Sequence, residues 1–420
     1  MLPKPRLFES QREFLLFVLV MLLLLLGRLG WEYYHYRQFI AKPFYYTHAI
    51  VLNAYEKHKG RRTYTVLKLQ SDEGLRFYTT THSKQALDHS YLRLQIFPDA
   101  RIRFWEYLGT FYVKSRIKEY KALPETMQER LGKWIAKQHS DSRMGAFYNA
   151  IFLALPLPQT LREPIAALGV SHLVALSGFH LSILWGLLYG LLVLPYRALQ
   201  QRYFPYRYAL IDVGMVVMVL LGIYVWFVGA PPSLLRSYAM VLVGWVVLLL
   251  GLELMSFTFL AAVFAILTVL FPSLLVSLSF WLSVAGVFYI FLLLQYTKGL
   301  HPWLIMLLVI PVGIFILMLP IVHGIFGMTT SYQLLSPILS LLFIPFYPVS
   351  FFLHLIGMGD LFDPALQRLF ALPKESSEIL LPWWIVVGYV GLSMGAVRYR
   401  ALFYLTLLFA ALYALFLFIV

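Results

Sequence analysis

The chain has 420 residues, of which 60% are hydrophobic and only 13% are charged. A soluble domain could not cover so much apolar surface, so the composition indicates a polytopic membrane protein. The net charge is +14, and residues 31–145 hold 20 lysines and arginines against 11 acidic residues. The chain contains no cysteine, which excludes disulfides, cysteine-ligated zinc and thiol chemistry.

Residues 1–30 are predicted to form a transmembrane anchor. The apolar run Phe14–Leu26 follows three basic residues, Lys4, Arg6 and Arg12. This layout resembles a signal peptide, but no small-residue cleavage site follows it. We therefore expect a retained anchor with a cytoplasmic N-terminus, because positive charge stays on the cytoplasmic side. The polar stretch after it would then lie outside the cytoplasm.

Residues 31–115 show the short alternating runs of a β domain. Charged and apolar residues alternate at 91–97 and at 101–105, as they do in half-buried strands. Turn-forming residues at 56–62 and 72–74 separate the earlier runs. The predicted strands are 46–55, 63–70, 75–81, 91–97 and 101–105. Several short strands in so few residues indicate a small barrel similar to an OB-fold.

Basic residues of this domain are candidates for binding DNA. The candidates are Lys57, Lys59, Arg61, Arg62, Arg101 and Arg103. Single strands bind where a basic groove carries exposed aromatic rings, and Tyr64, Tyr78 and Phe104 would supply the rings. The alternative is a solvated basic loop with ordinary core aromatics, and the sequence leaves both interpretations open.

Residues 116–146 are predicted to form an amphipathic helical connector that lies on the membrane surface. Leu123, Met127, Leu131 and Trp134 recur at helical spacing, and charged residues lie between them. The apolar run that follows, at 147–157, is too short to cross a bilayer.

Residues 147–420 are predicted to form a polytopic α-helical channel domain. We expect spans near 178–195, 209–228, 237–252, 256–271, 273–294, 303–320, 334–356, 380–396 and 402–420. With the anchor and re-entrant segments, this makes about nine to eleven helices. Arginine-rich loops at 197–207 and 398–400 conflict with simple alternation of all the spans. One span, or the stretch 323–332, is therefore expected to be re-entrant or broken.

The segment Gly169–Ser182, GVSHLVALSGFHLS, places polar residues inside an apolar stretch long enough to cross a bilayer. His172, Ser177 and His180 are costly in hydrocarbon, so they are expected to face a protein interior or a hydrated path. Gly178 allows a helix break or close helix packing. Pore-lining histidines and hydrogen-bonded structural histidines both fit the pattern.

Arg236 is the only basic residue between Arg207 and Lys298. It follows two prolines and Ser233, so its guanidinium would reach an aqueous cavity and attract phosphates. An arginine that extends to the interface, or that pairs with Glu253, is the alternative. Further pore candidates are Ser233, Ser279 and His323.

Four segments resemble motifs of the ComEC family, the inner-membrane channels of natural transformation. They are GVSHLVALSGFH at 169–180, GAPPSLLRSYAM at 229–240, the run from Pro272 to Ser283, and the run from His323 to Pro345. Ser336-Pro337 stands where the family often has an asparagine. With the β domain, the resemblance covers roughly residues 44–400 in one order.

The resemblance implies a multi-pass protein of the bacterial inner membrane that passes single-stranded DNA into the cytoplasm. It also implies an extracytoplasmic OB-like domain, a DNA receptor outside the membrane, and a cytoplasmic helicase or DNA-binding protein. Many relatives end in a metallo-β-lactamase-like domain, which we do not find in this sequence. Homo-oligomerisation is left open.

No catalytic residue, metal site or cofactor is predicted. Nucleophile elbows, HExxH and phosphate-loop motifs are absent from the sequence, and Ser177 with His180 has no orienting carboxylate nearby. The predicted function is a channel for uptake of single-stranded DNA, with the lipid bilayer as surroundings. The alternative is a secondary transporter of a small anionic solute, which would also use broken helices and polar midplane groups.

Overall fold

The structure is a computed structural model that describes residues 7–59, 62–82, 87, 90–249, 256–372 and 376–419. The chain divides into two compact units. One comprises Met1–Leu7, Met127–Leu260 and Leu282–Val420, and the other comprises Phe8–Thr126 and Ala261–Trp281. We call them the helical unit and the sheet unit, and each is described by itself.

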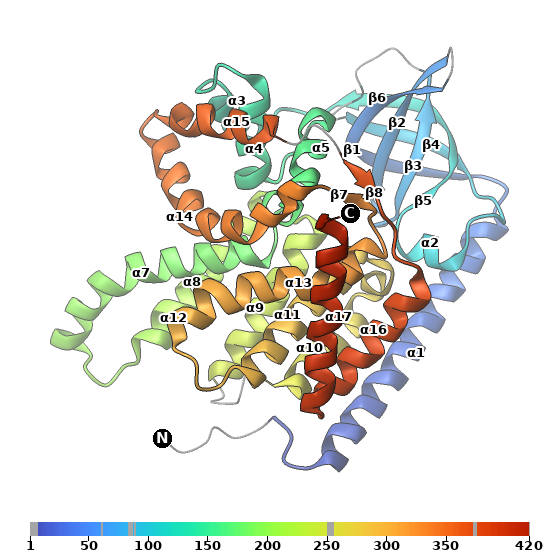
Figure 1. Cartoon of the computed structure of the whole chain (residues 1–420). Helices are drawn as coiled ribbons and strands as arrows, with labels where there is room; N and C mark the ends of the chain where they lie inside the picture. The colour runs from blue at the N-terminus through green and yellow to red at the C-terminus, as the bar shows by residue number, and fades with distance from the viewer. Residues whose placement is uncertain are drawn as a thin grey trace. The chain divides into compact units, whose positions relative to one another are not determined.

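The sheet unit begins with a long helix and continues as a six-stranded sheet (Figure 1). The elements are α1 (Gln11–Ala41), β1 (Tyr45–Lys59), β2 (Arg62–Ser71), β3 (Arg76–Thr81), β4 (Ser90–Phe97), α2 (Phe104–Leu108), β5 (Phe111–Tyr112) and β6 (Lys114–Ala122). The strand order is β5-β3-β2-β1-β4-β6. The unit also contains most of α10 (Phe257–Leu270), all of η1 (Pro272–Val276) and the start of α11 (Leu278–Tyr296).

Alternation along the strands produces the core of the sheet. Leu92, Leu94 and Ile96 of β4 are fully buried, whereas Arg93 between them is exposed. Phe39 of α1 packs against this core. Thr79 of β3 and Ser115 of β6 are joined by a 2.7 Å hydrogen bond between their hydroxyls. Among the described residues, however, no ladder joins β5 to β6, so the strand-rich region is confirmed and closure of a barrel is not found.

The prediction of a strand at 101–105 is wrong. The chain turns at Ile102, whose backbone N–H donates to the Asp99 carbonyl at 3.0 Å, and then enters α2. The Glu106 carboxylate accepts from the Arg103 backbone N–H at 3.1 Å, as an N-terminal cap does. The cap therefore outweighs the alternating pattern. Ile102 lies in the turn and Phe104 begins the helix, so the same pattern does not require a strand.

The prediction that a helix begins at residue 116 is also wrong. Residues 114–122 form β6, which pairs with β4 from Phe97↔Lys114 to Ser90↔Ala122. Its exposed lysines suit an edge strand, where charge prevents pairing with another chain. Helix follows only as α3 (Met127–Ala136) and α4 (Ser142–Leu153).

The helical unit carries the remaining elements. They are α5 (Gln159–Ala167), α6 (Ser171–Val174), α7 (Gly178–Tyr203), α8 (Ala209–Phe227), α9 (Pro232–Leu249), the rest of α11, α12 (Pro302–Leu304), η2 (Ile305–Val309), α13 (Ile310–His323), β7 (Met328–Thr329), η3 (Ser331–Leu335), α14 (Ser336–Leu355), η4 (Gly359–Phe362), α15 (Asp363–Ala371), β8 (Ser377–Glu378), α16 (Trp383–Ala396) and α17 (Arg400–Ile419). Strand β7 lies in the otherwise irregular stretch after α13, where a broken span was expected, and it pairs with β8, which lies between α15 and α16.

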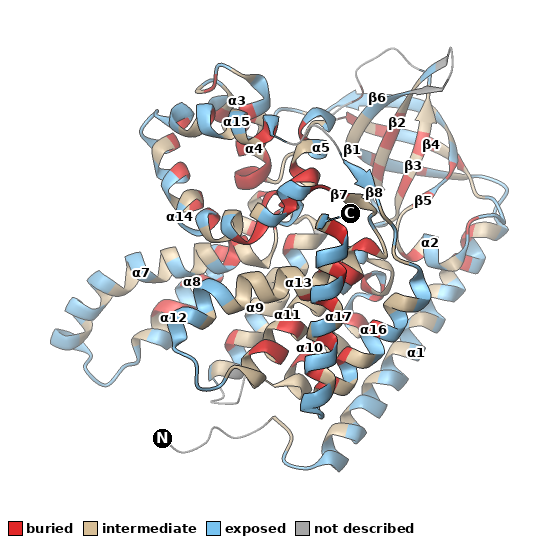
Figure 2. Cartoon of the chain, viewed as in Figure 1, coloured by how far each residue is buried: buried red, intermediate tan, exposed pale blue. Residues whose placement is uncertain are grey.

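Within the described part of the chain, seven helices are long and apolar enough to cross a membrane. They are Gln11–Ala41, Gly178–Tyr203, Ala209–Phe227, Leu278–Tyr296, Pro302–His323, Ser331–Leu355 and Arg400–Ile419. Ser233–Val246, Phe257–Leu270 and Trp383–Ala396 are apolar but shorter. Large apolar side chains cover the outer faces of these helices. Leu15 of α1, for example, is 65% exposed, and Figure 2 colours most of α1 pale blue, which marks exposed residues. Such surfaces require lipid, so the chain is a multi-pass membrane protein.

Candidate functional site

One face of α14 contacts the polar segment that precedes α7. The Ser336 hydroxyl donates to the Gly169 carbonyl at 3.1 Å, and one turn later Ser340 Oγ lies 3.3 Å from His172 Nε2. Because the Ser340 hydroxyl already donates to the Ser336 carbonyl at 2.8 Å, His172 Nε2–H is the donor in that contact. The two serines are four residues apart, so they share one side of the helix.

The same face of α14 continues to His180. The rings of Phe343 and Tyr347 both stand edge-on to the His180 imidazole, with centroids 5.1 Å away. His180 is fully buried, and its Nε2 has no hydrogen-bond partner among the described residues. An unpaired buried imidazole nitrogen is costly, so a water or ligand atom that hydrogen-bonds to Nε2 would be favoured here.

The helix does break between His172 and His180. Residues 175–177 are not helical, and α7 starts at Gly178 with Ser177 in an extended conformation. Ser177 Oγ accepts from the Phe179 backbone N–H at 3.3 Å, so it caps α7. Its 3.5 Å separation from His180 Nδ1 is too long for a strong hydrogen bond, which fits a cap better than a nucleophile–base pair.

Gly178 brings α7 close to α9. A Cβ at Gly178 would lie 3.5 Å from both Cβ and Oγ of Ser237. Ser237 in turn donates to the Ser233 carbonyl at 2.9 Å, within the first turn of α9. The two predicted motifs, 169–180 and 229–240, are therefore in contact.

The stretch that follows α13 contacts the N-terminal end of the Gly169–Ser182 segment. Gly169 has φ +69° and packs against the Gln333 and Ser336 side chains, and Thr330 donates to the Ala167 carbonyl at 2.5 Å. His323 is 1% exposed; its Nδ1–H donates to the Leu319 carbonyl at 3.0 Å, and its Nε2 lies 2.9 Å from Thr329 Oγ1. With both nitrogens engaged, His323 anchors this stretch.

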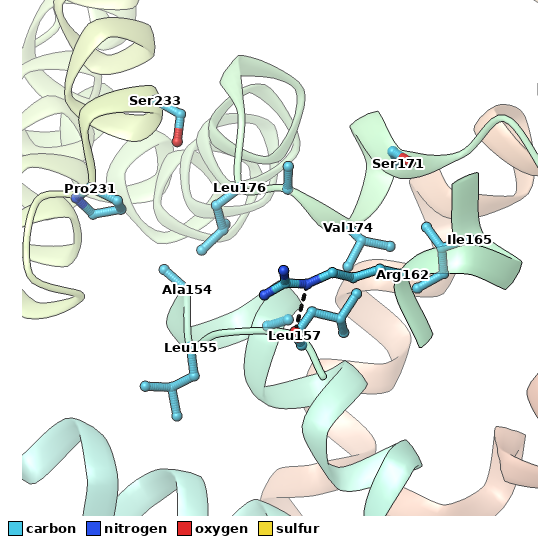
Figure 3. A pocket seen from close by; sticks show the side chains of 12 residues that line it. Ala154, Leu155, Leu157, Arg162, Ile165, Ser171, Val174, Leu176, Pro231 and Ser233 are labelled. Carbon is cyan, nitrogen blue, oxygen red and sulfur yellow. Dashed lines mark hydrogen bonds between the residues drawn. The ribbon is translucent and has the colours of Figure 1, made fainter. Parts of the chain in front are cut away.

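A cavity of about 340 Å³ lies where these segments meet (Figure 3). Its lining residues are Ala150, Ala154, Leu155, Leu157, Arg162, Ile165, Ser171, Val174, Ala175, Leu176, Pro231 and Ser233. Figure 3 shows the Arg162 side chain extending into it, with the guanidinium among Ala154, Leu157 and Leu176. Arg162 Nε donates to the Leu157 carbonyl at 2.8 Å, which orients the fork and leaves the two terminal nitrogens directed at the cavity.

The basic residue of this cavity is Arg162 rather than Arg236, which we expected to reach it. Arg236 is partly buried on α9 and is not among the described lining residues, although Ser233, one turn earlier, is. Arg162 escaped sequence reasoning because it precedes the membrane-length segment by only a few residues and resembles an interfacial charge. The remaining candidate, Ser279, belongs to the sheet unit, where its Oγ lies 3.2 Å from Ser277 Oγ.

The sequence pattern of the competence protein family matches residues 156–420, more than half of the chain. The chain belongs to the competence protein family. The resemblance to ComEC proteins is thereby confirmed. No match was found among curated proteins, and none among solved structures.

The competence-family region contains every predicted pore candidate and the cavity arginine. It also contains Ser336, whose hydroxyl donates to the Gly169 carbonyl. The family indicates a part in DNA uptake during competence.

Among the described residues, the predicted DNA-binding residues lie in two groups at opposite ends of β1. Arg61 lies outside the described residues, and so do the side chains of Lys59 and Arg62. Lys57 is twelve residues beyond Tyr45 on β1, up to about 40 Å along the strand. Arg101 and Arg103 follow the end of β4 that pairs with Tyr45, so they lie at the opposite end of β1.

A different basic and aromatic surface covers the solvent side of β1, β4 and β6. His48 and Tyr91 stack with ring centroids 5.5 Å apart and 2° between planes. The Arg93 guanidinium lies 5.9 Å from the Tyr46 ring, and the Arg116 guanidinium 5.7 Å from the Phe97 ring. We call this set of six residues the platform. The strand alternation at 91–97 was the signal for it, because Arg93 faces away from the leucines that flank it.

Proposed function

We propose that the helical unit is a channel that passes single-stranded DNA through the cytoplasmic membrane during natural transformation. The observation that carries the proposal is Arg162, directed into a cavity that is lined mostly by residues of the competence-family region. A guanidinium with free terminal nitrogens suits a phosphate, because its planar fork matches two phosphate oxygens. In this role the cavity forms part of the path of the strand.

The architecture around the cavity supports passage of a polyanion. The helix break at Ser177–Gly178 and the contact of Gly178 with Ser237 put polar backbone beside the cavity, which lipid would not tolerate. The cavity volume falls within the range of about 300–1,000 Å³ typical of small-ligand pockets, enough for one nucleotide-sized group at a time. Widening to a continuous path would require relative movement of α7, α9 and α14.

The test replaces Arg162 by alanine in a transformable host. Loss of one charge-assisted contact to phosphate costs about 1.5–3 kcal/mol, or roughly a tenfold to hundredfold loss of transformation if passage is limiting. Arg162→Lys should keep part of the activity. Arg197→Ala, which removes an exposed arginine of α7, is the matched control and should leave transformation unchanged.

Two outcomes contradict this proposal. One is wild-type transformation in Arg162→Ala at an equal amount of membrane-inserted protein. The other is a defect in which labelled DNA fails to bind the cell surface, which would place Arg162 before passage. The expected defect leaves DNA stalled outside the cytoplasm.

A secondary transporter of a small anion is the second candidate, because one arginine in a small cavity also suits a small anion. Transport of inorganic phosphate or a short dinucleotide into vesicles that contain the protein, together with normal transformation in a deletion strain, would favour the transporter.

The sheet unit is proposed to receive the strand outside the cytoplasm. The platform combines cations with exposed rings, which is the chemistry that OB-like domains use for single strands. An outer DNA receptor would deliver the strand, and a cytoplasmic helicase or DNA-binding protein would draw it inward. These partners are the ones that the resemblance to ComEC proteins implies.

A further inference from the structure

Three titratable side chains outside the cavity form one hydrogen-bonded chain. His139, between α3 and α4, places Nδ1 2.9 Å from one oxygen and 3.0 Å from the other oxygen of Asp363 at the start of α15. His139 Nε2 lies 3.1 Å from His354 Nε2 near the end of α14. His354 Nδ1 lies 2.6 Å from the Ser350 carbonyl. All three residues are buried.

The contacts determine where the protons are. A carbonyl only accepts, so His354 Nδ1 carries a proton, and in neutral His354 the Nε2 must accept. His139 Nε2 must then donate. The contact between His139 Nδ1 and Asp363 needs one more proton, which sits on the imidazole or on the carboxyl. The triad therefore holds one proton more than a carboxylate with two neutral imidazoles.

Removing that proton breaks the chain whichever tautomer results. If His139 keeps its Nε2 proton, its Nδ1 lone pair faces a buried carboxylate. If the proton moves to Nδ1, two Nε2 lone pairs face each other unless His354 gives up its bond to Ser350. Each arrangement leaves a buried polar atom unsatisfied, which is unfavourable.

The surroundings favour the proton-bound form. The Tyr148 ring stacks on His139 at 4.7 Å and 13°, and its π face attracts an imidazolium. Burial, the largest cause, raises the pKa of Asp363, and the negative charges of Asp360 and Asp141 act in the same direction, opposed by His139. Asp141 is itself paired with Arg143 at 2.8 Å, and burial raises the pKa of the Tyr148 hydroxyl above its usual range.

The triad lies at the far end of the α14 face that contacts the Gly169–His180 segment. Ser336, Ser340, Phe343, Tyr347, Ser350 and His354 follow one another at spacings of three or four residues. Gln138 adds a second tie, donating to the His354 carbonyl at 3.1 Å and accepting from the Gly359 backbone N–H at 3.0 Å.

We infer that His139, His354 and Asp363 form a proton-binding latch that fastens the C-terminal end of α14 to the α3–α4 connection and to α15. With its proton the latch is closed; without it the latch opens. Helix α14 also contacts the Gly169–His180 segment. Opening of the latch therefore removes one of the contacts that fix this helix. The inference does not depend on what passes through the cavity.

The sign follows from the direction of the Asp363 pKa. A carboxyl whose pKa is raised in the closed state stabilises that state at every pH below its pKa in the open state. This contribution is lost as the pH rises through the pKa of the closed state. Between the pKa of the open state and the higher pKa of the closed state, each pH unit should lower the closed-to-open ratio by up to about tenfold.

The experiment measures hydrogen exchange of the full chain in nanodiscs between about pH 4 and pH 9, a range that starts near the ordinary pKa of an aspartate and extends upward because the Asp363 pKa is raised. Protection of segments 136–144 and 350–363, corrected for intrinsic exchange, is expected to fall at least tenfold with rising pH. Asp363→Asn should abolish this dependence, because its amide donates to a neutral His139 Nδ1 and replaces the titrating proton. Asp360→Asn removes a nearby exposed carboxylate that raises the Asp363 pKa, so this variant should keep the fall in protection but shift it to lower pH.

Protection that is independent of pH in the unmodified chain overturns the inference. An unchanged pH dependence in Asp363→Asn also overturns it. If Asp363→Asn fails to accumulate, the comparison of the unmodified chain with Asp360→Asn still decides, because the latch predicts that the fall in protection moves to lower pH in Asp360→Asn, and an unshifted fall overturns it.

Discussion

At the scale of single residues, hydrogen bonds to the backbone orient side chains in and beside the described cavity. Arg162 is held by its Nε bond to the Leu157 carbonyl, and Ser177 by its cap on α7. His180, in contrast, keeps an unsatisfied nitrogen in an apolar setting of Phe343 and Tyr347. Such a group stands ready for a water or a ligand atom, because either would remove the cost of burial.

A substitution series at Gly178 tests the contact of α7 with α9. The 3.5 Å spacing to Ser237 is ordinary van der Waals contact, so Gly178→Ala should retain transformation. Gly178→Leu overfills the contact, which costs about 1–3 kcal/mol and separates the helices. We expect transformation to fall at least tenfold with normal membrane insertion, measured by transformation frequency and by the amount of protein in the membrane. Equal transformation in both variants would show that the contact of Gly178 with Ser237 is not needed for DNA passage.

At the scale of elements, α14 connects regions that are far apart in sequence. Its one face contacts Gly169, His172 and His180 at one end and His139 at the other. The sheet has a comparable division, because β4 buries its leucines and presents Arg93 and Tyr91 to solvent. In β4 the two-residue period places core residues and solvent-facing candidates on opposite faces. In α14 the spacing of three or four residues places successive contacts on one face.

The platform predicts where a single strand binds the sheet unit. Arg93→Ala with Arg116→Ala should weaken binding of single-stranded oligonucleotide to the full chain in nanodiscs. The slope of log affinity against log salt should fall by about 0.7 for each phosphate contact removed. Lys57→Ala, at the distant end of β1, is the control and should bind as before. A slope unchanged in the double variant would contradict binding at the platform.

At the scale of the whole molecule, seven helices of membrane length among the described residues accompany a sheet unit rich in charge. The positive N-terminus of α1 predicts a cytoplasmic start, which would place the sheet outside the cytoplasm. The absence of cysteine makes this orientation directly measurable, because every introduced cysteine is unique.

Single cysteines at Lys114 and Arg202 test that orientation. Both positions are exposed, one on β6 and one near the end of α7. Lys114→Cys should react with an impermeant maleimide in intact spheroplasts, whereas Arg202→Cys should react only after permeabilisation. The reverse pattern would invert the topology and place the platform in the cytoplasm.

The sequence by itself determined the class of protein, most helices, four of the strands and the family, because composition and periodicity are local properties. It failed at residues 101–105, where an N-terminal cap outweighs an alternating pattern, and at residues 116–122, where pairing with β4 outweighs the predicted helix.

Only the tertiary structure decided which polar residues meet. It placed Arg162 in the cavity, joined Gly178 to Ser237, and brought His139, His354 and Asp363 together from segments more than 200 residues apart. Sequence spacing carries no record of such contacts, because they arise from the packing of helices whose order in the chain does not determine their neighbours.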